Sequence, residues 1–191
     1  MSARSRTARH VGRDALLAFA LGSSAAAQAL LLGGGGVGAA VSALAIAAPF
    51  LAARRRTDAR TFLAIASLGG LAMLLGARLD VALLGRPEHV HGAPALSSLL
   101  SLSTAAMLVV CFGWQALTND PHCPRGPAAR LFVCAGMLAG MWAGGALVAS
   151  HGPSMHVAMV LGMALGHVAS GRLVGHLSRT AAVRDAAHEV N

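Results

Sequence analysis

The stretch from Leu131 to Val174 reads LFVCAGMLAGMWAGGALVASHGPSMHVAMVLGMALGHVASGRLV and carries the clearest structural signal in the chain. Two apolar runs, 131–149 and 155–174, flank a short break that contains Pro153. Each run approaches the roughly 20 residues that a helix needs to cross the hydrocarbon core of a bilayer. Because backbone amides in hydrocarbon must be paired within their own segment, both runs are predicted to be transmembrane helices.

The same pattern recurs toward the N-terminus and gives six apolar windows in the 191 residues. The composition agrees, since 55% of the residues are hydrophobic and 12% are charged, whereas soluble domains carry about 25% charged residues. The sequence therefore predicts an all-α fold, a polytopic membrane helical bundle. Four consecutive glycines, residues 33–36, are expected to form a turn between the first two helices. The windows are 15–32, 37–53, 61–79, 95–117, 131–149 and 155–174.

The placement of arginine predicts the orientation of these helices. Thirteen of the 15 arginines fall at the chain ends and in alternate connections, and only Arg78 and Arg86 fall on the opposite side. Cytoplasmic segments of membrane proteins carry such an excess of positive charge. Arginine without any lysine, together with abundant alanine and glycine, is typical of a GC-rich bacterial genome. We therefore expect a bacterial inner-membrane protein with cytoplasmic ends at 1–14 and 175–191 and a six-span domain at 15–174.

The first window has a second interpretation. Arginines, an apolar stretch and the residues Ala27, Gln28 and Ala29 resemble a cleavable secretory signal. The apolar residues continue past that point through Leu32, which favours a retained membrane anchor. Cleavage would leave five spans and would not change the direction of the others.

Charge and cysteine content argue against several function classes. The net charge of +8 comes from arginines in short clusters between apolar runs. A nucleic-acid-binding module instead gathers basic residues on one surface, so we expect no nucleic-acid binding. Cys111 and Cys134 lie within apolar runs, where they fit small apolar side chains, and no CxxC pair occurs. No nucleophile–base pair is evident, so the sequence favours a role without catalysis.

The predicted topology brings histidines from separate segments to the outer face of the membrane. His89 and His91 follow the third window near Asp80, His151 follows the fifth, and His156 opens the sixth. Imidazole is a good ligand for zinc and copper. We therefore predict a metal-capture cluster of these four histidines, although each of them also fits a polar loop residue in contact with water.

The sixth window carries a row of four metal-capable residues. His156, Met159, Met163 and His167 follow one another at intervals of three, four and four residues. At 100° per residue they lie within about 80° of one helix face. Thioether sulfur selects copper(I), so the row predicts a track along which copper passes inward. Methionine is also a common core filler, and one interhelical hydrogen bond would explain His167.

The fifth window adds Met137 and Met141, one turn apart, and Met141 is expected at the depth of Met163. The same window repeats glycine at every fourth position, a pattern that lets neighbouring backbones approach closely in membranes. These glycines are Gly136, Gly140 and Gly144.

Two function hypotheses follow. The first is an integral membrane protein that binds, and translocates, a soft transition metal such as copper. The alternative is a non-catalytic scaffold or accessory subunit whose glycine-rich faces bind a membrane-protein partner or a second copy of the chain. Haem is not expected, because one haem needs opposing ligands from two helices. The combination of methionine- and histidine-bearing helices is similar to small membrane proteins that handle metals, but no motif identifies a family.

Overall fold

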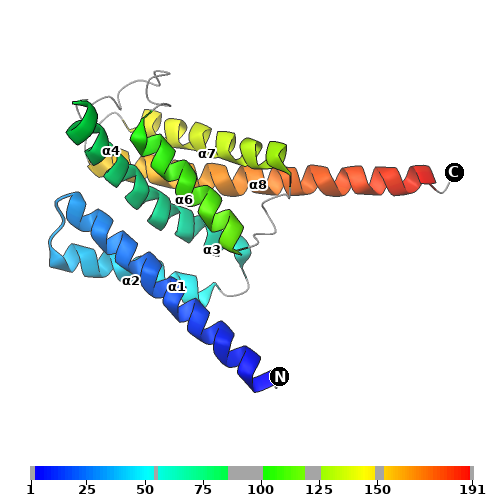
Figure 1. Ribbon diagram of the computed structural model, residues 1–191, viewed down its shortest axis with the longest axis horizontal. Coiled ribbons are helices and arrows are strands. Elements are labelled where there is room, and N and C mark those ends of the chain that lie inside the picture. The colour runs from blue at the N-terminus through cyan, green and yellow to red at the C-terminus, as the bar shows by residue number, and fades with distance from the viewer. Residues whose placement is uncertain (1–2, 54–55, 86–100, 119–125, 149–152, 190–191) are drawn as a thin grey trace. The chain divides into compact units, whose positions relative to one another are not determined.

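The computed structural model describes residues 3–53, 56–85, 101–118, 126–148 and 153–189 (Figure 1). Of these described residues 93% are helical, and none of them lies in a strand. Four of the helices are long and apolar enough to cross a membrane, and two further apolar helices are shorter. The predicted all-α fold is confirmed, and the helices mark the chain as a membrane protein.

Each of the six predicted windows overlaps a helix. The third window is interrupted by a π-helical turn, and the last helix continues well beyond the sixth window into the segment expected to be a tail. The elements are α1 (Ala3–Leu31), α2 (Gly36–Ala52), α3 (Thr57–Ala64), η1 (Ile65–Gly69), α4 (Gly70–Leu84), α6 (Leu102–Thr118), α7 (Pro127–Leu147) and α8 (Pro153–Glu189).

Contacts between the helices divide the chain into two compact units, residues 1–110 and 111–191, with the boundary inside α6. Each unit buries apolar side chains of its own, such as Phe50 in the first and Met163 in the second. Other large apolar side chains remain on the surface, and Leu147 is 86% exposed. Extensive exposed apolar surface marks a lipid or protein contact rather than a surface in water.

In the first unit, α1 and α2 are antiparallel neighbours joined at the glycine run (Figure 1). Gly33 has a φ of +84°, which lies in the left-handed region that residues with side chains rarely adopt. The backbone N–H of Gly34 then donates to the carbonyl oxygen of Ala29 at 2.7 Å and closes the last turn of α1. The turn predicted for residues 33–36 is therefore present.

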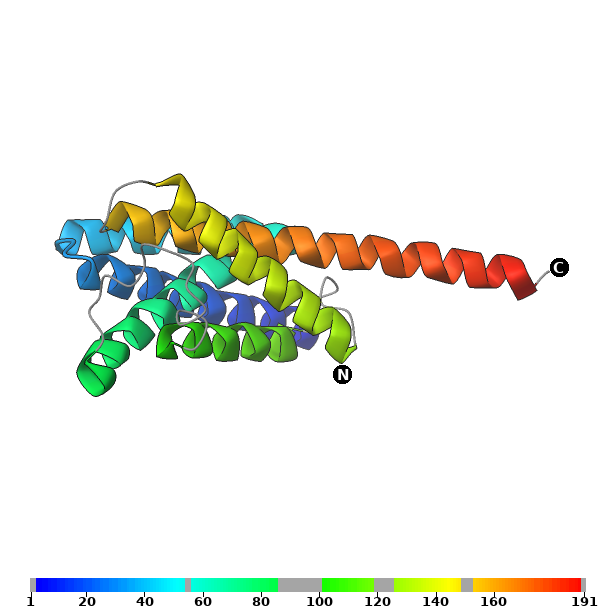
Figure 2. The same ribbon diagram turned by 90° about the horizontal axis from the view of Figure 1, so that it is seen from above.

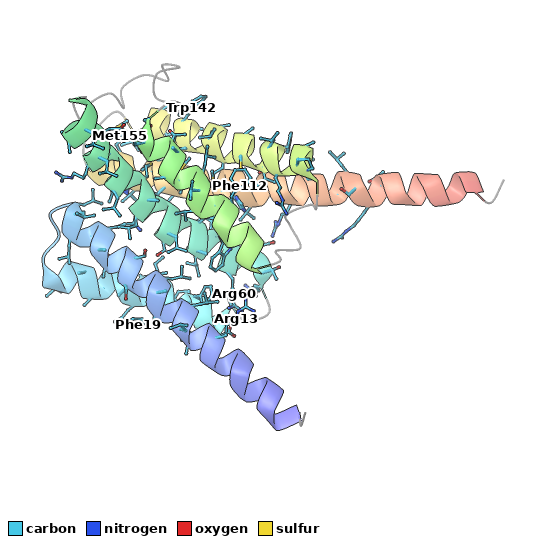
Figure 3. The ribbon with its side chains drawn as sticks, viewed as in Figure 1. Arg13, Phe19, Arg60, Phe112, Trp142 and Met155 are labelled. Atoms are coloured by element: carbon cyan, nitrogen blue, oxygen red, sulfur yellow. The ribbon has the colours of Figure 1, made fainter. Side chains whose placement is uncertain are left out.

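One end of this unit is held by a charged contact. The guanidinium of Arg60, at the start of α3, lies 2.6 Å from the Asp14 carboxylate of α1. It also lies 4.3 Å from the centroid of the Phe50 ring of α2, within the range of a cation–π contact. Figure 3 labels both Arg13 and Arg60 toward this end of the unit. The basic residues that precede the first span and follow the second thus share one end of the unit, as the arginine pattern predicts.

The π-helical turn η1 is tied to α1 by polar side chains. The Gln28 amide nitrogen donates to the Ser67 carbonyl oxygen at 2.6 Å. The hydroxyl of Ser67, a fully buried residue, donates to the Leu21 carbonyl oxygen at 2.6 Å. Interhelical hydrogen bonds of this kind satisfy polar side chains that would otherwise be buried in hydrocarbon.

Candidate functional site

The second unit is built on a very close contact between α7 and α8, which run antiparallel side by side (Figures 1 and 2). A Cβ atom added to Gly140 would overlap the carbonyl oxygen of Gly162, and one added to Gly162 would overlap that of Gly140. A Cβ added to Gly166 would likewise overlap the carbonyl oxygen of Gly136, whereas one added to Gly136 would first meet the Ser170 side chain. The hydrogen that stands in the Cβ position of Gly140, Gly162 and Gly166 therefore points at a carbonyl oxygen of the other helix, a geometry that weak Cα–H···O contacts favour.

This contact sets the register of the two helices. Gly140 meets both Gly162 and Gly166, and Gly144 meets Ala158 and Gly162. A residue of α7 and a residue of α8 are therefore level along the pair when their two residue numbers add to about 304. Met141 lies level with Met163, as the sequence analysis expects, and Met137 lies level with His167.

The four α8 residues singled out in the sequence, which we term the α8 row, are all buried. The exposed fraction of the side chain is 0% for Met163 and 3% for His167, and it does not exceed 9% for His156 and Met159. Their shared burial agrees with the predicted common helix face. Met137 and Met141 on α7 are buried as well, so thioethers from both helices occupy the interior of this unit.

Gly145 lets the α8 row reach the backbone of α7. Its missing Cβ would lie 3.1 Å from Cγ and 3.6 Å from Sδ of Met159. The methyl carbon of Met155, which Figure 3 labels near the start of α8, lies 3.9 Å from the same position. The side chain of Met159 therefore rests directly on the α7 backbone, in space that any larger residue at position 145 would occupy.

A contact between two sulfur atoms joins α6 to α7. The thiol of Cys111 donates to the sulfur of Met137 at 3.1 Å, and both residues are fully buried. Cys134, one turn before Met137, is also buried and lies close enough to Cys111 for an electrostatic interaction. The sequence analysis treats both cysteines as small apolar side chains. The signal available there was the spacing of three between Cys134 and Met137, which puts two sulfurs on one helix face.

Not every predicted ligand belongs to this interior. His89, His91 and His151 lie outside the residues that the structure describes. His156 and His167 are eleven residues apart on one helix, roughly 16 Å along its axis, so they do not meet at one ion. Within the described ranges, no three histidine, cysteine, aspartate or glutamate side chains come close enough to hold a metal.

No family model, curated protein or solved structure matches this chain. The second unit buries soft sulfur donors, which are thioethers on α7 and α8 and thiols on α6 and α7, together with two imidazoles on α8.

Proposed function

We propose that this membrane protein binds a soft monovalent metal ion, copper(I), in the interior of the α7–α8 pair. The observation that carries the proposal is that Met141 and Met163, both buried, lie level with each other along a helix pair whose backbones meet at glycines. Two neutral thioethers at one level, one from each helix, offer a soft cation the beginning of a coordination shell.

Ligand chemistry favours copper(I) over other ions. Thioether sulfur is a soft donor and selects copper(I), whereas hard cations such as magnesium and calcium require oxygen ligands. Bringing a cation into hydrocarbon requires ligands that replace its water, because isolated charge in the bilayer is unfavourable. The α8 row would supply such ligands one helical turn apart, which suits stepwise movement along the helix.

In this proposal the ion moves from the outer face of the predicted topology inward. His89, His91, His151 and His156 would capture the ion at the outer face, and Met159, Met163 and His167, with Met141, would carry it inward. The first three histidines are a sequence-based part of the proposal, since they lie outside the described residues.

The alternative of a scaffold or accessory subunit rests on glycine-rich helix faces that would bind a partner. Gly136, Gly140 and Gly144 already meet Gly162 and Gly166 of the same chain. This face of α7 is therefore covered by α8, and it offers no surface to another protein while the pair is intact. We accordingly favour metal binding.

Copper(I) titration of the detergent-solubilised protein against a competing chelator tests the proposal. We expect stoichiometric binding by the wild type. In the double variant Met141→Leu, Met163→Leu, the binding phase that depends on this methionine pair should be weaker by about tenfold or more, which corresponds to at least about 1.4 kcal/mol. Exchange of methionine for leucine conserves volume, so the core should remain packed. Met73→Leu is the matched control, because Met73 is a buried methionine of the first unit.

Two results would contradict the proposal. If the wild-type protein binds no copper(I), the proposed function is wrong. A double variant whose whole titration curve matches that of the wild type would remove the methionine pair from the site.

A further inference from the structure

On the basis of the copper(I) binding proposed above, we propose that Cys111, Cys134 and Met137 form a sulfur-only site where the ion is held most tightly. None of the three belongs to the α8 row or to the histidine cluster. They come from two helices of the second unit and are all buried, with Cys111 and Met137 fully so. The site would therefore be shielded from water and from competing ligands.

The observed sulfur positions are close to those that a copper ion needs. The Cys111 and Met137 sulfurs are 3.1 Å apart. With metal–sulfur bonds of about 2.3 Å, as in zinc thiolates, two sulfurs of a trigonal site lie roughly 4 Å apart. The Met137 sulfur must therefore move by about 1 Å, which the three rotatable bonds of a methionine side chain allow. Cys134, on the same α7 face, is placed to supply the third sulfur.

Charge balance also suits a membrane interior. Before binding, the Cys111 thiol donates its hydrogen to Met137. On binding, the S–H bond of Cys111 breaks, a bond from its sulfur to copper forms, and the proton leaves to solvent. Met137 and the thiol of Cys134 donate lone pairs, and no atom is oxidised or reduced. One thiolate balances one copper(I), so the occupied site is as neutral as the empty one.

The site is continuous with the methionines of the helix pair. Met137 lies one turn from Met141 on α7, and the register of the pair places it level with His167. An ion that leaves the level of Met141 and Met163 therefore reaches Met137, whose sulfur contacts Cys111, after a single helical turn. A thiolate binds copper(I) more strongly than a thioether does, because it adds charge attraction to soft donation.

The test compares the wild type with Cys111→Ser and Met137→Leu, titrated with copper(I) against a chelator, with X-ray absorption of the loaded protein. We expect a coordination shell of sulfur alone in the wild type and an affinity lower by at least about 100-fold in Cys111→Ser. Wild-type affinity should rise about tenfold per pH unit while the thiol is protonated, because one proton leaves per ion. Cys123→Ser and Met73→Leu are the matched controls, expected to bind as the wild type does.

The outcomes separate this site from the function it refines. If the wild type binds no copper(I), both proposals fall. If the wild type binds copper(I) but Cys111→Ser and Met137→Leu bind it equally tightly, the sulfur-only site is wrong and the α7–α8 proposal stands. Should Cys111→Ser fail to fold, the volume-conserving Met137→Leu decides, with a weaker affinity in support and an unchanged affinity against.

Discussion

Asp80 is a buried carboxylate that caps a helix. It is 7% exposed near the end of α4. Its two oxygens accept hydrogen bonds from the backbone N–H groups of Leu102 at 3.0 Å and Ser103 at 3.3 Å. These groups lie at the start of α6, where helical N–H groups have no partner within the helix. The sequence predicts Asp80 near the histidines of the outer face. In the structure its carboxylate caps the start of α6.

Replacement of Asp80 by alanine should therefore destabilise the first unit. The loss of a helix cap costs about 0.5–2 kcal/mol of the free energy of unfolding. Thermal unfolding in detergent, followed by circular dichroism, measures the loss. Asp80→Asn keeps one acceptor oxygen and should lose less, whereas an alanine variant as stable as the wild type would contradict the capping role.

Packing by backbone contact is the main feature at the scale of helices. Gly162 and Gly166 on α8 pack against Gly136 and Gly140 on α7 with no side chain between them. Without a hydrophobic driving force between helices in lipid, such van der Waals contact is a chief source of helix association. Because it also sets the register, the glycine contact decides which methionines of the two helices lie level.

Two glycines of α8 allow a matched test of this contact. A methyl group at Gly166 would overlap the carbonyl oxygen of Gly136, whereas one at Gly175 would meet nothing within 4 Å. Overpacking of this kind costs about 1–3 kcal/mol, so Gly166→Ala should lower the unfolding temperature. Gly175→Ala should be neutral or raise stability by about 0.5–1 kcal/mol, because alanine is the better helix former.

Chemical denaturation in the same detergent compares the two variants directly. If both variants unfold together with the wild type, the helices do not meet through these glycines. The copper(I) affinity of Gly166→Ala should fall as well, since separation of the helices would move Met141 away from Met163.

At the scale of the whole molecule, basic residues collect at one end of each unit. In the first unit, the ion pair of Arg60 with Asp14 joins the first half of α3 to the middle of α1. In the second, the α7–α8 register brings Arg130 level with the segment of α8 that contains Arg172 and Arg179. This clustering within each unit is what the positive-inside pattern requires of alternating spans.

The predicted topology puts positions 89 and 151 on the same, outer side of the membrane. Single cysteines introduced as His89→Cys and His151→Cys, in a Cys123→Ser background, should both react with a membrane-impermeant thiol reagent added to intact cells. Arg56→Cys, in a basic cluster expected inside, should react only after permeabilisation. Reaction of positions 89 and 151 from opposite sides would overturn the six-span topology and the histidine cluster.

Much of the architecture was predictable from local patterns. A long apolar run can satisfy its backbone in hydrocarbon only as a helix, so hydropathy located every described helix. The glycine run at 33–36 predicted a turn, and the repeat of Gly136, Gly140 and Gly144 predicted a close contact. The intervals of the α8 row predicted that its four residues share one helix face, and the burial of all four agrees with this prediction. Each of these inferences depends on residues close together in the chain.

Contacts between distant residues were not predictable in this way. Nothing near Cys111 indicates that its thiol meets Met137, and nothing near Asp80 indicates that it caps α6. The hydropathy pattern also gives no sign of the π-helical turn or of the division into two units. Such pairings depend on the rotation and register of each helix, which many weak contacts decide together. Hydropathy specifies that a helix forms, whereas the packed fold specifies which of its side chains meet.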